Sequence, residues 1–250
     1  MNFIQETVSV WNKYHGTLLL GVGTTMIISV VGTIIGLIIG LINGVIRTVP
    51  TPKMTISKII LKIANILITV YVEFFRGTPL MVQAMVIFWG YAYATGGSTL
   101  PLLPAGIGIC AINTGAYVTE IIRGGIISVD KGQFDGAQSI GLNHMQTMVH
   151  VIIPQVLRNV LPAVSNEFVV NIKDTSVLNV IGVTELFRYT QIVAQSNLKI
   201  FPTYIISCMI YLVLTFTVTV ILRAFERLLA GKKTYKLFDG HTVVKPEEEV

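Results

Sequence analysis

The sequence predicts an all-α membrane protein with five transmembrane helices. Of its 250 residues, 52% are hydrophobic and only 12% are charged, whereas about 25% of the residues of a soluble globular domain are charged. Residues 16–46, 77–119 and 200–222 contain no Asp, Glu, Lys or Arg. Since about 20 apolar residues cross a bilayer as a helix, each stretch is long enough for a span.

The first span is expected over residues 17–45, with residues 1–16 on the outer side of the membrane. A cleaved signal peptide is the alternative for this run. It is disfavoured because an h-region has only about 7 to 15 apolar residues and because no small-residue cleavage pattern follows the run. Glycine recurs at every fourth position of the span, at Gly32, Gly36, Gly40 and Gly44. This spacing lets a second helix approach closely, so a packing role is predicted.

Residues 54–95 contain two apolar runs separated by FRGTP, so they form either one bent span or two. Cytoplasmic loops carry an excess of Lys and Arg, and this rule decides between the two topologies. With one span, the basic residues between 47 and 62 fall on the same side as Arg123 and Lys131. Two spans would place these groups on opposite sides of the membrane. One bent span is therefore predicted.

The remaining spans are expected over residues 101–122, 147–170 and 203–225. Residues 17–230 then form a single transmembrane domain, with the N-terminus outside and the C-terminus in the cytoplasm. The cytoplasmic tail, residues 231–250, is charged and poor in apolar residues, which is typical of a disordered end.

Several kinds of chemistry are disfavoured by the composition. Cys110 and Cys208 lie inside apolar runs, which predicts buried side chains and no disulfide. The net charge of +5 comes from basic residues beside membrane segments, which indicates topology rather than nucleic-acid binding. The histidines lack the spacing of metal ligands, and Ser196 and Lys199 match S-x-x-K without its companion motifs. No Walker A motif occurs, so the chain is expected to hold no cofactor and not to hydrolyse ATP itself.

A polar loop, residues 124–147, separates the third and fourth spans and carries a spaced motif. The motif consists of Asp135-Gly136-Ala137, Gly141, Val151 and Ile153-Pro154. It resembles the EAA loop of ATP-binding-cassette (ABC) importer permeases, where Glu-Ala-Ala is followed by three residues, Gly, nine residues, Ile, one residue and Leu-Pro. The spacing agrees throughout, and the departures keep acidic, small and apolar character. Gly136 in place of alanine costs about 1 kcal/mol of helix propensity.

Residues 71–83, 115–133 and 161–176 resemble the polar amino acid permeases of the same superfamily, and the resemblance covers about residues 15–230. It implies the type I ABC importer permease fold (MetI-like), with a cytoplasmic coupling helix near residues 132–144 that seats on an ATPase subunit. The positions that this role assigns to coupling are Gly132, Asp135, Gly136, Ala137, Gly141 and Pro154. An acidic first turn and a glycine that permits close approach suit such a contact. An ordinary cytoplasmic connector is the alternative.

Charged residues also occur within and just after the fourth span. On insertion scales, a charge at the centre of a membrane helix costs about 2.5 to 3.5 kcal/mol, so such residues are usually partnered or functional. Glu167 and Asp174 are seven residues apart and share a helix face, beside Lys173. Arg76 precedes a Gly and a Pro, where a helix is expected to break. The resemblance places substrate contacts at these four positions. Internal ion pairing is the alternative.

The sequence therefore predicts the permease subunit of an ABC importer for a polar amino acid in the bacterial cytoplasmic membrane. The resemblance implies a second permease, identical or similar, two ATPase subunits that hold ATP and Mg, and an extracytoplasmic solute-binding protein. Two alternatives are an ion-driven transporter, which usually has internal repeats and more spans, and a membrane enzyme, which needs a nucleophile and base or a metal pair. The amino acid stays open between basic ones, which are slightly preferred, and glutamine.

Overall fold

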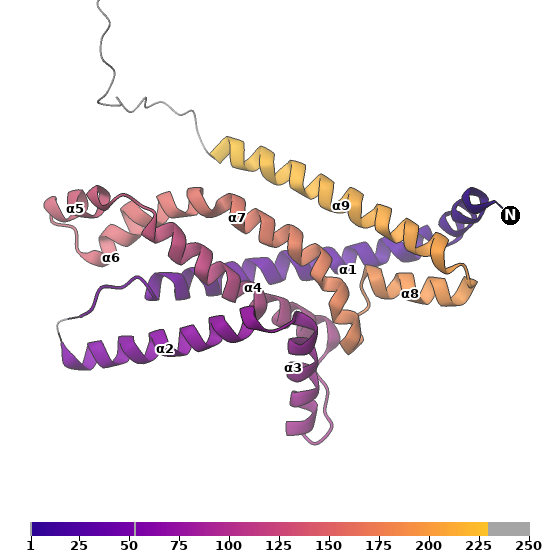
Figure 1. Cartoon of the computed structure of the whole chain (residues 1–250), viewed down its shortest axis with the longest axis horizontal. Coiled ribbons are helices and arrows are strands. Elements are labelled where there is room, and N and C mark those ends of the chain that lie inside the picture. Colours follow the sequence, from indigo (N-terminus) through magenta and orange to yellow (C-terminus); the bar gives the residue numbers. More distant parts are fainter. Residues whose placement is uncertain (1, 53, 230–250) are drawn as a thin grey trace, which may run out of the picture.

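The computed structural model describes residues 2–52 and 54–229, and within these ranges every regular element is helical. The predicted tail, residues 231–250, lies outside them. The elements are α1 (Phe3–Ile46), α2 (Thr55–Gly77), α3 (Leu80–Ala94), α4 (Leu102–Ile127), α5 (Lys131–Ser139), α6 (His144–Thr147), the π-helical η1 (Met148–Ile152), α7 (Ile153–Asp174), the 3₁₀-helical η2 (Thr175–Ile181), α8 (Leu186–Asn197) and α9 (Ile200–Leu229) (Figure 1).

Five helical segments within the described ranges are long and apolar enough to cross a membrane. They are α1, α2, α4, the run from α6 through η2 and α9. This confirms the five-span prediction. The boundaries differ from the expected ones, because α1 already begins at Phe3 and the fourth segment extends from His144 to Ile181.

Helices α1 and α4 pack along the predicted row of glycines. Gly32, Gly36, Gly40 and Gly44 face Cys110, Thr114, Val118 and Ile122 in turn. A Cβ atom on Gly44 would lie 2.6 Å from Cγ2 of Ile122, closer than real side chains approach. Only glycine allows the two backbones to come this near, so the predicted packing role is confirmed.

The same register shows that α1 and α4 run parallel, because residue numbers rise together along both sides of the contact. Had residues 54–95 crossed the membrane twice, α4 would run antiparallel to α1. Helix α3 has 15 residues, below the length of a span. The segment therefore crosses once, and the prediction of one bent span is confirmed.

Helix α2 ends and α3 begins at the FRGTP motif. Thr78 is extended, with φ −123° and ψ 150°, and Pro79 forms the N-cap of α3. Proline disfavours helical geometry in the residue before it, which explains why the helix ends at Gly77. Figure 1 shows α3 standing across the direction of α2.

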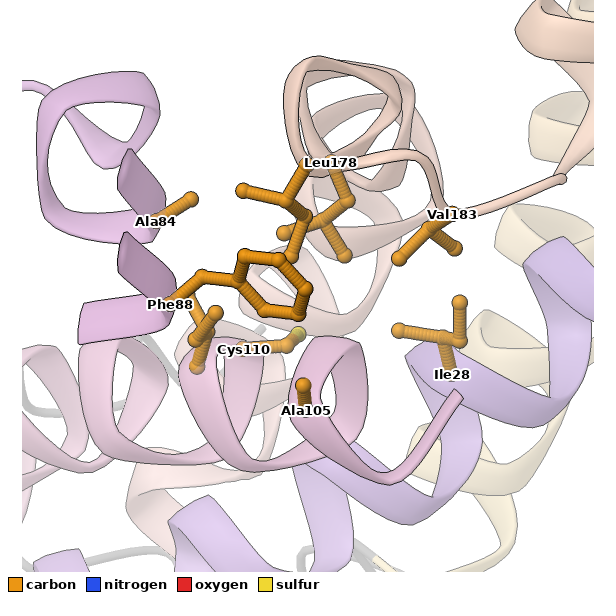
Figure 2. Packing of buried hydrophobic residues seen from close by; sticks show 9 residues of the cluster. Ile28, Ala84, Phe88, Ala105, Cys110, Leu178 and Val183 are labelled. Atoms are coloured by element: carbon orange, nitrogen blue, oxygen red, sulfur yellow. The ribbon is translucent and has the colours of Figure 1, made fainter. Parts of the chain in front are cut away.

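Helix α3 is held by an apolar cluster from four parts of the chain (Figure 2). Phe88 of α3 lies among Cys110 of α4, Leu178 of η2 and Ile28 of α1. Cys110 is buried, as predicted, whereas Cys208 is exposed on α9, so the prediction of a buried side chain is wrong for that residue. The cluster fixes the corner between α2 and α3 against the rest of the bundle.

Helix α8 was not expected from the sequence, and its N-cap is a buried carboxylate. The Oε2 and Oε1 atoms of Glu185 accept hydrogen bonds from the backbone N–H groups of Phe187 and Arg188, both at 2.8 Å. Tyr211 of α9 donates to Oε2 at 3.0 Å. Burial raises the pKa of the Glu185 carboxyl above its ordinary value, although these hydrogen bonds act in the opposite direction. The cap joins α8 to α9.

Candidate functional site

Arg76 lies in the last turn of α2, directly before the helix break. Its Cζ atom is 5.5 Å from the centroid of the Tyr117 ring on α4, a distance typical of a cation–π contact. The residue is exposed, so its guanidinium remains open to a further partner. The expected break is confirmed, and it places an exposed cation at the terminus of an apolar helix.

The face of α7 that carries Glu167 and Asp174 is turned toward α1 and α4. Asn171 lies between them on the same face, and its Nδ2 donates to Thr33 Oγ1 at 2.8 Å and to Thr114 Oγ1 at 2.9 Å. Because these hydrogen bonds are buried, they fix the rotation of α7. Glu167 and Asp174 are consequently half-buried on either side of Asn171.

The structure places Glu167 within electrostatic range of both Arg76 and Asp174. It also places Asp174 within electrostatic range of Lys173. None of these four residues forms an ion pair within 4 Å among residues 2–52 and 54–229. Both ion pairs in that part of the chain belong to Glu120 instead. The alternative of mutual ion pairing is therefore not realised in this structure.

Glu120 is a charged residue that the sequence reasoning missed. It accepts from Arg123 Nε at 3.0 Å and from Arg123 Nη2 at 2.8 Å, and it also pairs with Arg47 after the end of α1. The i, i+3 spacing of Glu120 and Arg123 was a usable signal. The pairing with Arg47 had no such signal, because Arg47 is 73 residues away from Glu120 in the sequence. From the sequence, the charge of Arg47 served only to predict topology. The triad joins the ends of α1 and α4.

The polar loop forms a short helix, α5, with defined ends. Asp130 caps it by accepting from the backbone N–H of Gly132 at 2.6 Å. Gly141 has φ +83°, its N–H donates to Gln138 O at 2.9 Å, and the N–H of Leu142 donates to Ala137 O at 3.1 Å. This pair of bonds is a Schellman motif, which needs a left-handed residue.

Two expectations about this loop are wrong in detail. No acidic residue lies in the first turn of α5, since the helix begins at Lys131 and Asp135 falls in the second turn. Gly141 terminates the helix, and a Cβ there would meet nothing within 4 Å of the same chain, so its close approach to a partner protein stays a prediction. The helix also ends at Ser139, before the expected limit of 144.

Helix α5 packs against α6 and η1, which follow it in the chain. Ala137 is 4% exposed, and Phe134 packs against a cluster that includes Met148 and Ile152 of η1. Pro154 is the second residue of α7, directly after the π-helical turn. Proline has no N–H to donate and its ring displaces the preceding carbonyl, so a widened turn suits this position. Asp135, Gly136 and Gly132 remain exposed.

Residues 59–231 match the family described as "Binding-protein-dependent transport system inner membrane component". The match covers most of the chain. The chain belongs to this family of transport permeases. It is consequently a multi-pass membrane subunit of an ABC transporter.

Relatives of the permease have named functions. It is 41% identical over 162 residues to the L-cystine transport system permease protein TcyB of Bacillus subtilis (strain 168), covering 64% of this chain and 68% of that one. It is 36% identical over 165 residues to the glutamine transport system permease protein GlnP of Escherichia coli (strain K12), covering 66% of this chain and 75% of that one.

Solved structures share the fold of the permease. The crystal structure of an amino acid ABC transporter with histidines has a chain that is 35% identical, with a TM-score of 0.75 over 91% of this chain and 99% of that one. The inward-facing MetNI methionine ABC transporter is 17% identical, with a TM-score of 0.70 over 87% of this chain and 98% of that one. The MetI-like type I importer permease fold is thus confirmed.

Proposed function

We propose that the permease is the membrane-spanning subunit of an ATP-driven importer that carries a polar amino acid across the bacterial cytoplasmic membrane. The observation that carries this proposal is the grouping of Arg76, Glu167, Lys173 and Asp174, charges of both signs without an ion pair among the described residues. The names of the relatives, which concern L-cystine and glutamine, support the same class of solute.

An amino acid needs a site with both signs of charge, since its backbone carries an ammonium and a carboxylate. Arg76 takes the carboxylate, and Asp174 takes the ammonium while Lys173 balances the local charge. Glu167, two turns before Asp174 on the same face of α7, then meets the side chain. A carboxylate binds a cationic group most strongly, because charge-assisted hydrogen bonds are stronger than neutral ones. It also accepts from an amide, so glutamine remains a candidate beside arginine, lysine and histidine.

The cytoplasmic loop supplies the contact to an ATPase subunit, which holds ATP and Mg. Apolar side chains follow α5 on the surface, with Ile140 77%, Met145 67% and Val149 50% exposed. Exposed apolar side chains beside a capped polar helix are typical of a protein interface. The exposed coupling residues beside this surface are Gly132, Asp135, Gly136, Gly141 and Pro154. Ala137, the remaining coupling residue, is buried. A second permease, identical or similar, and an extracytoplasmic solute-binding protein complete the transporter.

The end of the molecule that carries α5 faces the cytoplasm in this proposal. In Figure 1 the end of α1, the start of α2 and the end of α4 lie at the same side as α5 and α6. Arg47, Lys58, Lys62 and Arg123 belong to these helix ends. Their accumulation on one side supports a cytoplasmic location by the positive-inside rule, with the N-terminus outside.

Uptake by proteoliposomes tests the proposal. The permease, its co-purified ATPase and its binding protein are reconstituted with ATP, and uptake of L-arginine, L-glutamine and L-cystine is measured with and without a protonophore. Uptake should require ATP and resist the protonophore. Abolition by the protonophore at constant ATP would instead indicate an ion-driven transporter, and turnover without any ATPase would favour a membrane enzyme.

The Glu167→Gln variant examines selectivity in the same assay. Hydrogen bonds to charged groups contribute about 1.5–3 kcal/mol and neutral ones about 0.5–1.5 kcal/mol. Uptake of L-arginine should therefore fall about tenfold more than that of L-glutamine, since about 1.4 kcal/mol corresponds to a factor of ten. Glu6→Gln, a half-buried carboxylate near the start of α1, is the control and should change neither. Equal uptake of all three amino acids by parent and Glu167→Gln would return Glu167 to a structural role.

A further inference from the structure

Gln83 is a buried amide at the corner between α2 and α3. It lies in the first turn of α3 and is 2% exposed. Its Nε2 atom is 2.9 Å from each of three oxygens, the carbonyl of Phe75, the carbonyl of Thr78 and the hydroxyl of Thr78. The side chain thus reaches back past Pro79 and donates hydrogen bonds to the carbonyls at the end of α2.

The same amide also joins the corner to α4. Its Oε1 atom accepts from Asn113 Nδ2 at 2.9 Å, and Asn113 Nδ2 lies 3.3 Å from the carbonyl of Phe75. Two side-chain amides from two helices therefore converge on one backbone carbonyl. A second link, from Tyr71 Oη to the carbonyl of Ile112 at 2.5 Å, lies one turn earlier on α2.

These bonds compensate for the interrupted helix. The last carbonyls of a helix have no intrahelical partner, and inside a membrane no water replaces one. The carbonyl of Phe74 is satisfied by the Thr78 hydroxyl at 2.8 Å, and that of Phe75 by Gln83 and Asn113. Arg76 is the next residue along the chain. The backbone that carries its guanidinium is therefore fixed on one side by Gln83.

We propose that Gln83 is a positioning residue for solute binding. It holds the terminus of α2 so that the guanidinium of Arg76 stays over Tyr117 and within electrostatic range of Glu167. Gln83 is buried beneath this terminus and acts on the solute only through Arg76. The inference rests on the proposed function, in which Arg76 takes the carboxylate of the amino acid. A general stabilising role of Gln83 is the competing explanation.

The test compares dissociation constants for L-arginine and L-glutamine on the purified permease–ATPase complex. Gln83→Leu removes the amide donor and acceptor and leaves an apolar side chain of similar size. It should raise the dissociation constant of the bound amino acid about tenfold, the effect of losing about 1.4 kcal/mol. Thr190→Val is the matched control. Thr190 is fully buried, and its hydroxyl bonds Leu186 O at 2.7 Å and Ser207 Oγ at 2.9 Å, far from Arg76 in the chain. This control should lower the unfolding temperature and leave the dissociation constant unchanged.

A double-mutant cycle with Arg76→Gln separates positioning from general stabilisation. If Gln83 acts through Arg76, Gln83→Leu should add nothing to the dissociation constant once Arg76 has been replaced. An equal increase in both backgrounds would overturn the inference, and so would an unchanged constant for Gln83→Leu alone. If Arg76→Gln itself leaves the constant unchanged, the proposed role of Arg76 is wrong, which is a different outcome.

Thr78→Val is a milder substitution, to be used if the Gln83→Leu variant does not fold. It removes the hydroxyl that bonds both Gln83 and the carbonyl of Phe74. The dissociation constant should rise in the same direction by a smaller factor, again only when Arg76 is present. An unchanged constant for a folded Thr78→Val complex would contradict the inference.

Discussion

Helix α4 contacts α1 and α2 in opposite ways. Toward α1 it presents side chains that fill the spaces above the row of four glycines, and the two backbones approach closely at each glycine. Toward the corner between α2 and α3 it presents Asn113, Tyr117 and the carbonyl of Ile112. These meet the amide of Gln83, the guanidinium of Arg76 and the phenol of Tyr71. Along the glycine row the contact is made by shape, whereas at the corner between α2 and α3 it is made by hydrogen bonds and charge.

The glycine contact gives structural support, whereas the polar contact belongs to the proposed solute site. Close packing of small residues associates membrane helices without any polar group. Polar groups in a membrane are expensive, and at the α2 break they satisfy backbone groups while Arg76 is left without an ion pair in the described ranges. A rigid apolar contact thus holds the helix on which the polar contact is built.

The first prediction breaks the glycine contact and has the largest expected effect. In Gly40→Leu the new Cβ would overlap Val118 and lie 2.9 Å from the backbone N of Thr119, which cannot rotate away. Overpacking a core costs about 1–3 kcal/mol even where side chains yield, so most of the protein should fail to fold. The monodisperse fraction in detergent measures this. Gly23→Leu, on the same helix with nothing within 4 Å, should behave like the parent; equal losses for both variants would contradict the assignment.

The second prediction concerns the ion triad, where an intermediate effect is expected. Glu120→Gln leaves Arg47 and Arg123 without their partner. Removing one partner of a buried pair costs about 3–5 kcal/mol. The side chains of Arg47 and Glu120 are 20% and 18% exposed, so solvent reduces the loss to about 1–3 kcal/mol. The unfolding temperature should fall, and high salt should narrow the gap to the parent. Glu73→Gln, an exposed carboxylate of α2, is the control, and an equal shift for both would refute the role of the triad.

The third prediction sharpens the description of α5 and has the smallest expected effect. Gly141→Ala forces a side chain into a left-handed residue with φ +83°, at a cost of about 1–2 kcal/mol. Gly136→Ala replaces a glycine inside the helix and should stabilise it by about 0.5–1 kcal/mol. Backbone hydrogen exchange of residues 131–142 should therefore quicken in the first variant and slow in the second. The same direction of change in both would show that Gly141 does not serve as the terminator.

The spans and the glycine contact could be predicted because hydropathy and four-residue spacing are local properties of the chain. The distribution of Lys and Arg also correctly predicted one bent span, rather than two spans, for residues 54–95. Helix α8 was missed because it is short, half polar and placed between two longer helices. The role of its cap, Glu185, depends on the hydrogen bond from Tyr211, which the sequence does not reveal. The partners of Glu120 and Gln83 depend on the tertiary structure, so spacing alone could not reveal them.

The glycine row also restricts how α1 and α4 can slide past each other. Its period of four residues corresponds to about 6 Å along a helix. A displacement by a fraction of that step would drive Val118 and Ile122 into the α1 backbone between glycines. The contact therefore resists small axial displacements, and a small axial movement of α4 at its α5 end should carry α1 with it.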